Sequence, residues 1–277
     1  MTSQPRLGPG HVPLSGPRPD SPSAEPAERY RRGRAGYPAA LAREVLRYAA
    51  ASAPVHVLEV GAGTGKATTR FAPHVAGLTC LEPDPAMAAV LRRTCRPYPS
   101  VAVEEVRFET WQPAGRRFDV LLCAQAWHCL PSPVRWSLAH RVLEPGGVLA
   151  LCWNAYGVVD PALHAELVRV DLRYGLRAEV PHTQQAGEIG GDVPPHHAPT
   201  HEIAGDPRFT DLRAVHHHRR ASYPTRRYLD LLATISVYKA APEAVRGAML
   251  REIGEVLDRA GGIELAVTTD LFLARTT

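Results

Sequence analysis

The chain has 277 residues, of which 45% are hydrophobic and 22% charged, and its formal net charge is +4. These values describe a globular chain with enough apolar material for one sizeable core or two modest ones, and they exclude disorder along the whole length. No run approaches the roughly 20 consecutive apolar residues of a membrane-spanning helix, and no signal-peptide core follows the first basic residues. The sequence therefore predicts a cytoplasmic protein without a membrane partner.

The cysteines and the charge balance narrow the class further. The five cysteines are odd in number, widely spaced and mostly set in apolar runs, which indicates buried thiols instead of a disulfide framework. The 32 Lys and Arg residues stand against 28 Asp and Glu residues, and the excess is scattered. Nucleic-acid-binding surfaces need a concentrated basic patch, so a small-molecule partner is favoured.

The first 26 residues differ in composition from the rest. They are crowded with Pro, Gly and Ser and hold almost no large apolar residues, so burial cannot offset the entropy lost on ordering. We expect residues 1–26 to form a disordered tail and residues 27–277 to form the folded domain. Pro38 is a favourable first-turn residue, and apolar residues recur after it at helical spacing, which predicts a helix that leads into the domain.

Residues 55–154 alternate short apolar runs with stretches of helix length. Strands and helices in alternation predict a parallel β-sheet that is covered by helices on both faces. The expected strands span residues 55–60, 77–82, 101–108, 118–124 and 147–154, and the expected helices between them span residues 66–75, 85–95 and 133–143.

This alternation breaks after Asn154. A helix is expected at residues 161–175, and a long connection rich in Pro, Gly and His follows at residues 178–207. Connections of this length inside a domain are usually lids, binding loops or disordered segments. The remaining expected elements are a strand at 208–223, helices near 225–237 and 242–260, and a hairpin or edge strand at 263–275.

The strongest local signal is an apolar strand, residues 57–60, that runs into glycines at alternating positions, Gly61, Gly63 and Gly65. Glycine lets the backbone turn tightly and approach a ligand closely, and the N-terminus of a following helix supplies free N–H groups. A dinucleotide fingerprint would need glycine at the position of Lys66. A Walker A loop would need four residues between its glycines and Ser or Thr after the lysine. Neither requirement is met, so both patterns are disfavoured.

The remaining pattern, an acidic residue followed by alternating glycines, resembles motif I of the class I S-adenosylmethionine-dependent methyltransferases. Further blocks extend the resemblance: Glu82 at the end of the second expected strand, residues 108–130, residues 143–154, and a lead-in that contains Tyr30, Arg34, Tyr37 and Pro38. These blocks look like the small-molecule branch related to trans-aconitate and ubiquinone-type enzymes. The resemblance covers roughly residues 28–154, and residues 263–275 resemble the closing strand of the family.

The resemblance implies a Rossmann-like α/β fold. The expected seven-stranded sheet has the order 3-2-1-4-5-7-6, with the last strand antiparallel and helices on both faces. Residues 155–240 are expected to form a substrate-cap insertion. Substrate specificity should reside there, because the motifs account for the cofactor half and inserted loops set function on a shared fold.

The resemblance also implies S-adenosylmethionine as the cofactor and S-adenosylhomocysteine as the product. Glu59 is expected near the methionine amino group, directly or through water, or else it braces the loop amides. Glu82 is expected to accept hydrogen bonds from the ribose hydroxyls. Tyr30 and Arg34 are expected to close over the methionine end, with Arg34 paired to the carboxylate, although an exposed arginine at a helix start is also common.

The adenine end is expected near the third strand. Phe108 or Glu109 should border the ring, and the backbone of Phe108 could read its edge. Arg107 departs from the family, because many relatives carry an acidic adenine contact at that place. The complete expected cofactor set is Tyr30, Arg34, Glu59, Gly61, Gly63, Gly65, Glu82, Phe108, Glu109 and Gln125.

Methyl transfer from a sulfonium is a direct displacement, which requires alignment and sometimes a base but no metal. Gln125, Trp127 and His128 follow the fourth strand at its carboxyl end, where ligands bind in open parallel sheets. Histidine has an unperturbed pKa of about 6.5, so His128 is the candidate catalytic base, or it binds without titrating. The expected substrate-binding residues are Tyr37, Trp127 and His128, although Trp127 could equally pack. Cys129 stands where relatives carry a second aromatic residue.

Clustered histidines in the second half invite interpretation as a metal site. Adjacent histidines in a strand point to opposite faces, and no acidic pair or cysteine lies at ligand spacing, so no metal is expected. One or two of them should line a substrate pocket, while Arg219 and Arg220 could receive an anionic substrate. The histidines concerned are His196, His197, His201, His216, His217 and His218.

The sequence thus predicts a methyl transfer to an O, N or C atom of a small molecule, and specialised metabolism could supply such an acceptor. The expected protein is a monomer or homodimer without a nucleic-acid partner. Two alternatives stay open. One is a protein that binds S-adenosylmethionine without methyl transfer, as a regulator or a non-methylating catalyst. The other is an RNA methyltransferase, which would bind nucleic acid with strong salt dependence.

Overall fold

The computed structural model describes residues 24–50, 54–177, 180–188 and 200–277. The strands are β1 (His56–Val60), β2 (Gly77–Leu81), β3 (Val101–Glu104), β4 (Phe118–Ala124), β5 (Leu143–Val158), β6 (Phe209–Tyr223) and β7 (Ile263–Thr276). The helices are α1 (Glu25–Gly33), α2 (Ala40–Ala49), α3 (Thr68–Phe71), α4 (Pro85–Thr94), α5 (Ser132–Val142), α6 (Pro161–Arg173), α7 (Thr200–Ala204), α8 (Thr225–Leu232), α9 (Ser236–Ala240) and α10 (Glu243–Ala260). Short 3-10 turns are η1 (Ala72–His74), η2 (Phe108–Thr110), η3 (Trp127–Cys129) and η4 (Ala186–Glu188).

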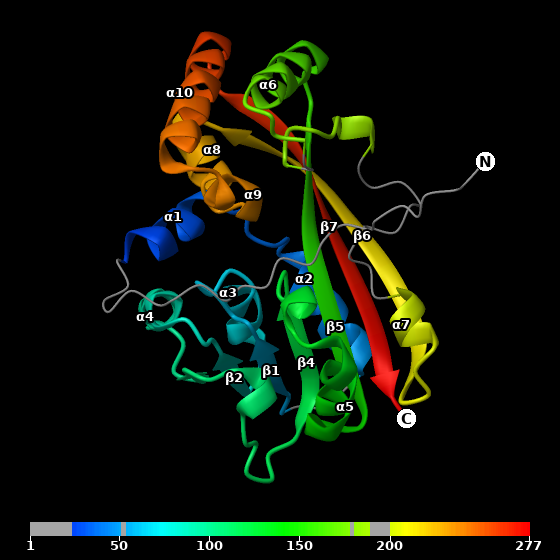
Figure 1. Ribbon diagram of the computed structural model, residues 1–277. Coiled ribbons are helices and arrows are strands. Elements are labelled where there is room, and N and C mark those ends of the chain that lie inside the picture. Colours follow the sequence, from blue (N-terminus) through cyan, green and yellow to red (C-terminus); the bar gives the residue numbers. More distant parts are fainter. Residues whose placement is uncertain (1–23, 51–53, 178–179, 189–199) are drawn as a thin grey trace, which may run out of the picture.

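All seven strands belong to one sheet of order β3-β2-β1-β4-β5-β7-β6 (Figure 1). The pairs from β3 through β5 are parallel, and β7 runs antiparallel to both β5 and β6. The predicted Rossmann-like sheet, including its order and its antiparallel last strand, is therefore confirmed.

The central strands are apolar on both faces because helices cover both faces. Val57 packs in a core cluster with α2 and α3, whereas its neighbour Leu58 packs in a second cluster with α5. Successive side chains of a strand point to opposite faces, so a doubly covered sheet needs nearly continuous apolar strands. This burial is the physical origin of the unbroken apolar runs in residues 55–154.

Several elements differ from the predicted bounds. The helix expected at residues 66–75 is reduced to α3, η1 and a turn, and β5 is much longer than the expected strand at 147–154. The expected cap range, residues 155–240, contains β6, which is a strand of the main sheet. α1 begins at Glu25, inside the predicted tail, and the first 23 residues of that tail lie outside the described residues.

Four helices, α6, α8, α9 and α10, gather beyond the carboxyl ends of β4 and β1 (Figure 1). A buried polar network joins three of these helices. Asp171 of α6 accepts hydrogen bonds from Tyr238 Oη at 2.9 Å and from His182 Nε2 at 2.7 Å, and His182 Nδ1 lies 2.9 Å from Tyr228 Oη. His182 and Asp171 are 0% and 3% exposed, so the network fixes the arrangement of these segments.

Within the described ranges, no helix combines the length and the apolar character that crossing a bilayer requires.

Candidate functional site

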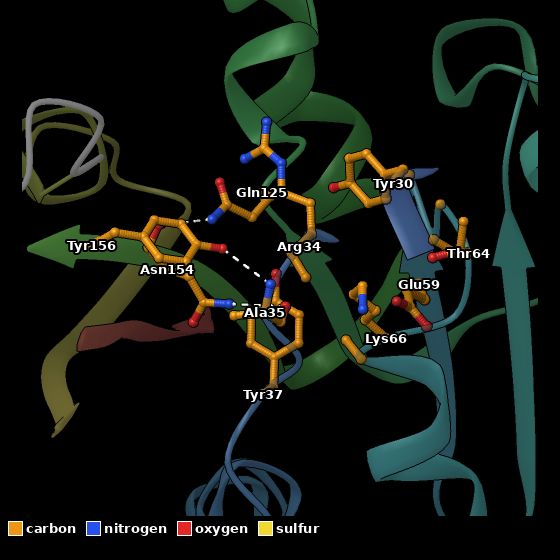
Figure 2. A pocket seen from close by; sticks show the side chains of 15 residues that line it. Tyr30, Arg34, Ala35, Tyr37, Glu59, Thr64, Lys66, Gln125, Asn154 and Tyr156 are labelled. Carbon is orange, nitrogen blue, oxygen red and sulfur yellow. Dashed lines mark hydrogen bonds between the residues drawn. The ribbon is translucent and has the colours of Figure 1, made fainter. Parts of the chain in front are cut away.

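An open cavity lies at the carboxyl ends of β1 and β4, beneath the C-terminal turn of α1 (Figure 2). Ligands bind at this edge of open parallel sheets. The lining residues are Tyr30, Arg34, Ala35, Tyr37, Glu59, Gly61, Ala62, Gly63, Thr64, Lys66, Ala67, Ala124, Gln125, Asn154 and Tyr156. Seven of them are residues that the sequence predicts for the site: Tyr30, Arg34, Tyr37, Glu59, Gly61, Gly63 and Gln125.

The glycine loop follows β1 in a conformation that only glycine adopts readily. Gly61, Gly63 and Gly65 have φ angles of +68°, +58° and +88°. A Cβ atom on Gly61 would lie 2.5 Å from the Cβ of Ala126, whereas a Cβ on Gly63 would meet no atom within 4 Å. The loop therefore packs against the segment after β4 at Gly61 and leaves open space at Gly63.

Glu59 lies at the end of β1 and is only 1% exposed. Its Oε2 accepts a hydrogen bond from Thr68 Oγ1 at 2.6 Å and a weaker one from Cys80 Sγ at 3.8 Å. Burial raises the pKa of this carboxyl from 4.5 to about 7, against the lowering effect of these bonds. A cationic group bound in the cavity would favour the charged form of Glu59.

Glu82 braces the glycine loop from the end of β2. Its Oε2 accepts a hydrogen bond from the Gly63 amide at 2.8 Å, and its Oε1 accepts one from the Asp84 amide at 2.9 Å. The side chain is buried, and burial raises its pKa although both backbone bonds oppose the shift. The residue that binds a loop amide is therefore Glu82 and not Glu59. The Glu82 carboxylate lies against the backbone of Gly63.

Arg34 follows α1 and enters the cavity as a cation. Its Nε donates to Thr234 Oγ1 at 2.7 Å and its Nη2 donates to the Thr234 carbonyl at 3.3 Å. The guanidinium also lies 5.4 Å from the ring centre of Tyr30, whose pKa is raised by burial. No carboxylate of the described residues lies within ion-pair distance of Arg34. The remaining N–H groups can therefore bind an anion.

The opposite wall comes from the extended end of β5. Tyr156 Oη accepts a hydrogen bond from the Ala35 amide at 3.1 Å, and Asn154 Nδ2 donates to the Ala35 and Gly36 carbonyls at 3.4 and 3.3 Å. Gln125 Nε2 donates to the Asn154 carbonyl at 3.0 Å, and Gln125 holds an uncommon φ of +63°. These contacts anchor the segment between α1 and α2 that carries Arg34 and Tyr37.

Sequence reasoning missed Asn154 and Tyr156 as lining residues. Both project from one face of β5, two residues apart. Asn154 ends the expected strand and Tyr156 lies just beyond it, so the alternation of side chains along a longer strand was the signal that could have found them.

Thr64 and Lys66 were also missed as lining residues, although they interleave with the loop glycines. Thr64 is 2% exposed, and its Oγ1 has no hydrogen-bond partner in the part of the chain that the structure describes. Lys66 Nζ donates to the Arg31 carbonyl at 2.8 Å, and burial lowers its pKa to about 8. A buried hydroxyl without a partner is uncommon, so the Thr64 hydroxyl is a candidate contact for a group bound in the cavity.

Six expected site residues lie outside the cavity lining: Gly65, Glu82, Phe108, Glu109, Trp127 and His128. Trp127 is 1% exposed and packs edge-on against Trp136, with ring centres 5.0 Å apart, so its side chain is part of the core. Phe108 is 3% exposed in the same core cluster, and Glu109 is half-buried beside it on η2. Gly65 faces α4, where a Cβ would lie 2.9 Å from Leu91.

His128 is exposed on η3, and its Nδ1 lies 3.5 Å from Trp153 Nε1, which donates a long hydrogen bond. Because Nδ1 is the acceptor in this contact, the neutral ring carries its proton on Nε2. Uptake of a proton at Nδ1 would require the contact with Trp153 to break.

The histidines of β6 alternate between the faces of the sheet, as expected for a strand. His216 pairs with Asp270 at 2.6 Å and His218 contacts Thr268 at 3.0 Å on one face, whereas His217 pairs with Glu44 at 2.8 Å on the other. Among the described residues there is no group of three or more side chains suited to a metal ion. His201 is exposed on α7, and His196 and His197 lie outside the described residues.

Arg219 and Arg220, considered above for an anionic substrate, already have partners. Arg219 Nη2 donates to the Gly36 carbonyl at 2.5 Å, and burial lowers its pKa. Arg220 pairs with Glu264 at 3.2 Å on the protein surface. Neither residue lines the cavity.

Comparison with known proteins agrees with this fold. Residues 57–147 match the family model of a methyltransferase domain. An uncharacterized methyltransferase of Mycobacterium tuberculosis is 35% identical over 127 residues, which cover 45% of this chain and 49% of the relative. An uncharacterized methyltransferase-like protein of Schizosaccharomyces pombe is 34% identical over 99 residues, or 35% of this chain and 38% of the relative. The match thus spans about half or less of these curated relatives.

Solved structures share the fold over most of the chain. A proposed type II methyltransferase of Anaeromyxobacter dehalogenans has a TM-score of 0.60 at 23% identity and covers 88% of this chain and 97% of its own. An S-adenosylmethionine-dependent methyltransferase of Thiobacillus denitrificans, solved in complex with S-adenosylhomocysteine, has a TM-score of 0.51 at 14% identity and covers 91% and 97%.

Residues 57–147 are thus similar to a methyltransferase domain, and the sheet has the order expected for class I, S-adenosylmethionine-dependent methyltransferases. This similarity supports the predicted resemblance, and the comparisons do not single out the small-molecule branch.

Proposed function

We propose that this chain binds S-adenosylmethionine in the cavity beneath α1 and transfers its methyl group to a small-molecule acceptor. One observation carries the proposal: a glycine loop with positive φ angles meets, in one cavity, an arginine that has no carboxylate partner among the described residues. The loop offers backbone to a nucleoside, and the guanidinium offers paired N–H groups to an amino-acid carboxylate.

Three features of the chain fit this cofactor. Open space at Gly63 admits a ligand close to the loop backbone. The Thr64 hydroxyl is buried next to Gly63 and has no hydrogen-bond partner within the described ranges, and a ligand oxygen or nitrogen would satisfy it. Glu59 and Arg34 supply an acidic group and a cation in the same cavity, which complement the amino and carboxylate groups of a methionine end.

We assign the remaining cofactor contacts by the same logic. Glu82 stands behind Gly63 and would receive the ribose hydroxyls with the oxygen lone pairs that the backbone amides leave free. Phe108 and Glu109 would border the adenine, and Tyr30 would cover the methionine end.

When bound, S-adenosylmethionine supplies an electrophilic methyl group on a sulfonium. The chain's own residues align the acceptor and exclude water, for which Tyr37, Gln125 and Tyr156 line the wall opposite the glycine loop. We propose that His128 takes up the proton of an O–H or N–H acceptor at Nδ1, with release of Trp153.

A small acceptor is supported by the low net charge of +4. The chain also lacks the Asn/Asp-Pro-Pro-Tyr type of segment after β4, where it has Ala124-Gln125-Ala126-Trp127 instead.

Calorimetric titration with S-adenosylhomocysteine tests the cofactor assignment. We expect micromolar affinity, about −8 kcal/mol, for the wild-type chain and no detectable binding for Gly63→Arg, whose side chain would fill the open space. Gly115→Arg is the matched control, because Gly115 also has a positive φ, +82°, and open surroundings but lies outside the cavity lining.

The outcomes separate folding from binding. Normal affinity of Gly115→Arg together with lost affinity of Gly63→Arg supports the site. Equal affinity in all three proteins contradicts it, as does a wild-type chain that is folded and does not bind.

A further inference from the structure

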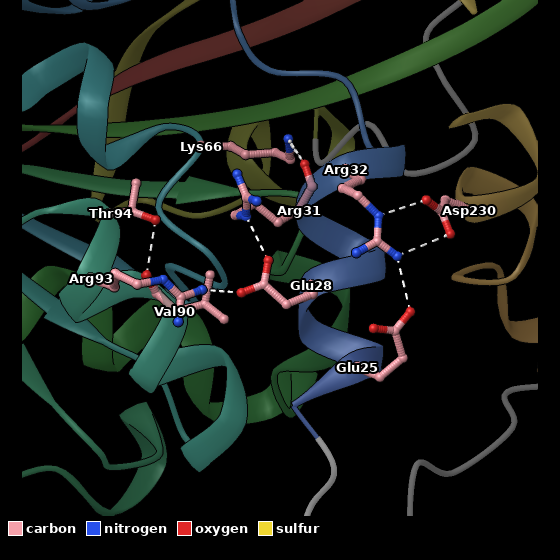
Figure 3. Close-up of polar contacts among 9 residues, drawn as sticks. All are labelled: Glu25, Glu28, Arg31, Arg32, Lys66, Val90, Arg93, Thr94 and Asp230. Carbon is pink, nitrogen blue, oxygen red and sulfur yellow. Dashed lines mark hydrogen bonds and ion pairs between the residues drawn. The ribbon is translucent and has the colours of Figure 1, made fainter. Parts of the chain in front are cut away.

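α1 covers the cavity (Figure 3). It lies between α4 and the glycine loop, which we call the cofactor half, and α8, one of the four helices α6, α8, α9 and α10 that we call the cap helices. Its last turn carries Tyr30, and Arg34 caps its end; both line the cavity. The position of α1 therefore decides where these two side chains stand over the cofactor site.

On the cap side, α1 is joined closely to α8. A Cβ atom on Gly33 would lie 2.4 Å from the Leu231 amide nitrogen, so the two backbones approach as nearly as glycine allows. Arg32 Nε lies 2.8 Å from Asp230 Oδ2, and Arg34 is hydrogen-bonded to Thr234 after α8. Because the two backbones are in direct contact, α1 and α8 cannot move apart without loss of this packing.

Toward the cofactor half, α1 makes polar contacts that are exposed or half-buried. Glu28 pairs with Arg93 of α4, and the Arg31 carbonyl accepts a hydrogen bond from Lys66 Nζ of the glycine loop (Figure 3). The side chains of Glu28 and Arg93 are 21% and 50% exposed. Glu28 also accepts a hydrogen bond from Arg31 at 2.8 Å, and these two arginines lower its pKa, so it stays charged at neutral pH.

We propose that Glu28 and Arg93 are positioning residues that latch α1 over the cavity and thereby slow the release of the cofactor. The inference rests on the proposed function, because it requires the cofactor to lie beneath α1. Exchange of a ligand from beneath α1 requires α1 to move away from α4 and the glycine loop, so the Glu28–Arg93 ion pair and the hydrogen bond from Lys66 Nζ to the Arg31 carbonyl must break. The contacts with α8 can stay intact during this movement.

Dissociation of S-adenosylhomocysteine, measured by surface plasmon resonance on the immobilised full chain, tests the latch. An exposed ion pair contributes up to a few-fold in an equilibrium or rate constant, so Glu28→Gln and Arg93→Gln should each raise the dissociation rate constant about three- to fivefold. The double variant should release the ligand no faster than Glu28→Gln alone, because both substitutions break one contact.

Arg92→Gln is the matched control. Arg92 precedes Arg93 on α4 and forms an ion pair of similar exposure, 48% and 39%, but its partner is Glu105 beside β3. We expect no change in the dissociation rate for this variant. Raising the ionic strength should speed dissociation from the wild type and should have less effect on Arg93→Gln, since salt screens exposed charges.

The outcomes distinguish this inference from the proposed function. If the wild type binds S-adenosylhomocysteine and neither substitution changes its dissociation rate, the latch is overturned while the cofactor site stands. Multiplied effects in the double variant, or an equal effect of Arg92→Gln, would also overturn the latch. A folded wild type that does not bind would overturn both.

Discussion

The buried carboxyl of Glu59 makes the stability of the unliganded protein depend on pH in a defined direction. Its pKa rises from 4.5 to about 7 in the folded chain, because burial favours the protonated form. A raised carboxyl pKa means that the folded state binds the proton more tightly than the unfolded state. The contribution to stability is therefore largest at low pH and is lost as the pH rises toward 7 and above.

The size of this effect follows from the two pKa values. The full difference corresponds to about 3 kcal/mol, of which about 2 kcal/mol falls between pH 5.5 and pH 8.5. Glu59→Gln removes the titration while its amide oxygen can still accept the hydrogen bond from Thr68 Oγ1. Relative to this variant, the wild type should lose about 2 kcal/mol of unfolding free energy over that range.

Urea denaturation of both proteins at intervals between pH 5.5 and pH 8.5, without cofactor, measures the difference directly. Other titrating groups are common to both proteins and cancel. Parallel stability profiles, or a wild type that gains stability relative to Glu59→Gln as the pH rises, would refute the reasoning.

Three further predictions concern the loop, the cap and the cofactor. Gly61→Ala should lower the unfolding free energy by about 2 kcal/mol or more in urea denaturation, because Gly61 has a φ of +68° and an added Cβ would clash with Ala126. The control Gly115→Ala, at a positive φ with open surroundings, should lower it by about 1 kcal/mol. Equal losses in the two variants would contradict the predicted clash. Asp171→Ala should cost about 3 kcal/mol by the same assay, because its buried histidine and tyrosine partners lose their acceptor, and a loss below 1 kcal/mol would contradict this. Calorimetry should find that S-adenosylhomocysteine binds about eightfold more tightly at pH 7.5 than at pH 6, because Glu59 ionises over this range. Glu59→Gln should abolish this pH dependence. An affinity of the wild type that does not change with pH would disprove the prediction.

The part of the site that the sequence predicted is local in the chain. The glycines and Glu59 lie within seven consecutive residues at the end of a strand, so their spacing alone places them at one sheet edge. The resemblance supplied the order of the strands, which periodicity alone cannot, because parallel strands read alike whatever their neighbours.

The remainder depends on contacts between distant parts of the chain. Thr234 holds Arg34 from 200 residues away, and nothing in the spacing of either residue records this pairing. The length of β5 follows from its antiparallel pairing with β7 as far as Val158, which brings Asn154 and Tyr156 to the cavity. Trp127 follows Gln125 by two residues but turns into the core on η3, a choice that packing against Trp136 decides.

A crystal structure of the chain with S-adenosylhomocysteine tests the central claim most directly. The account predicts a ligand along the glycine loop, with its carboxylate on Arg34, its amino group beside Glu59 and its ribose hydroxyls at Glu82. Electron density for the ligand outside this cavity, or in it with Arg34 and Glu82 both far from the ligand, would contradict the account.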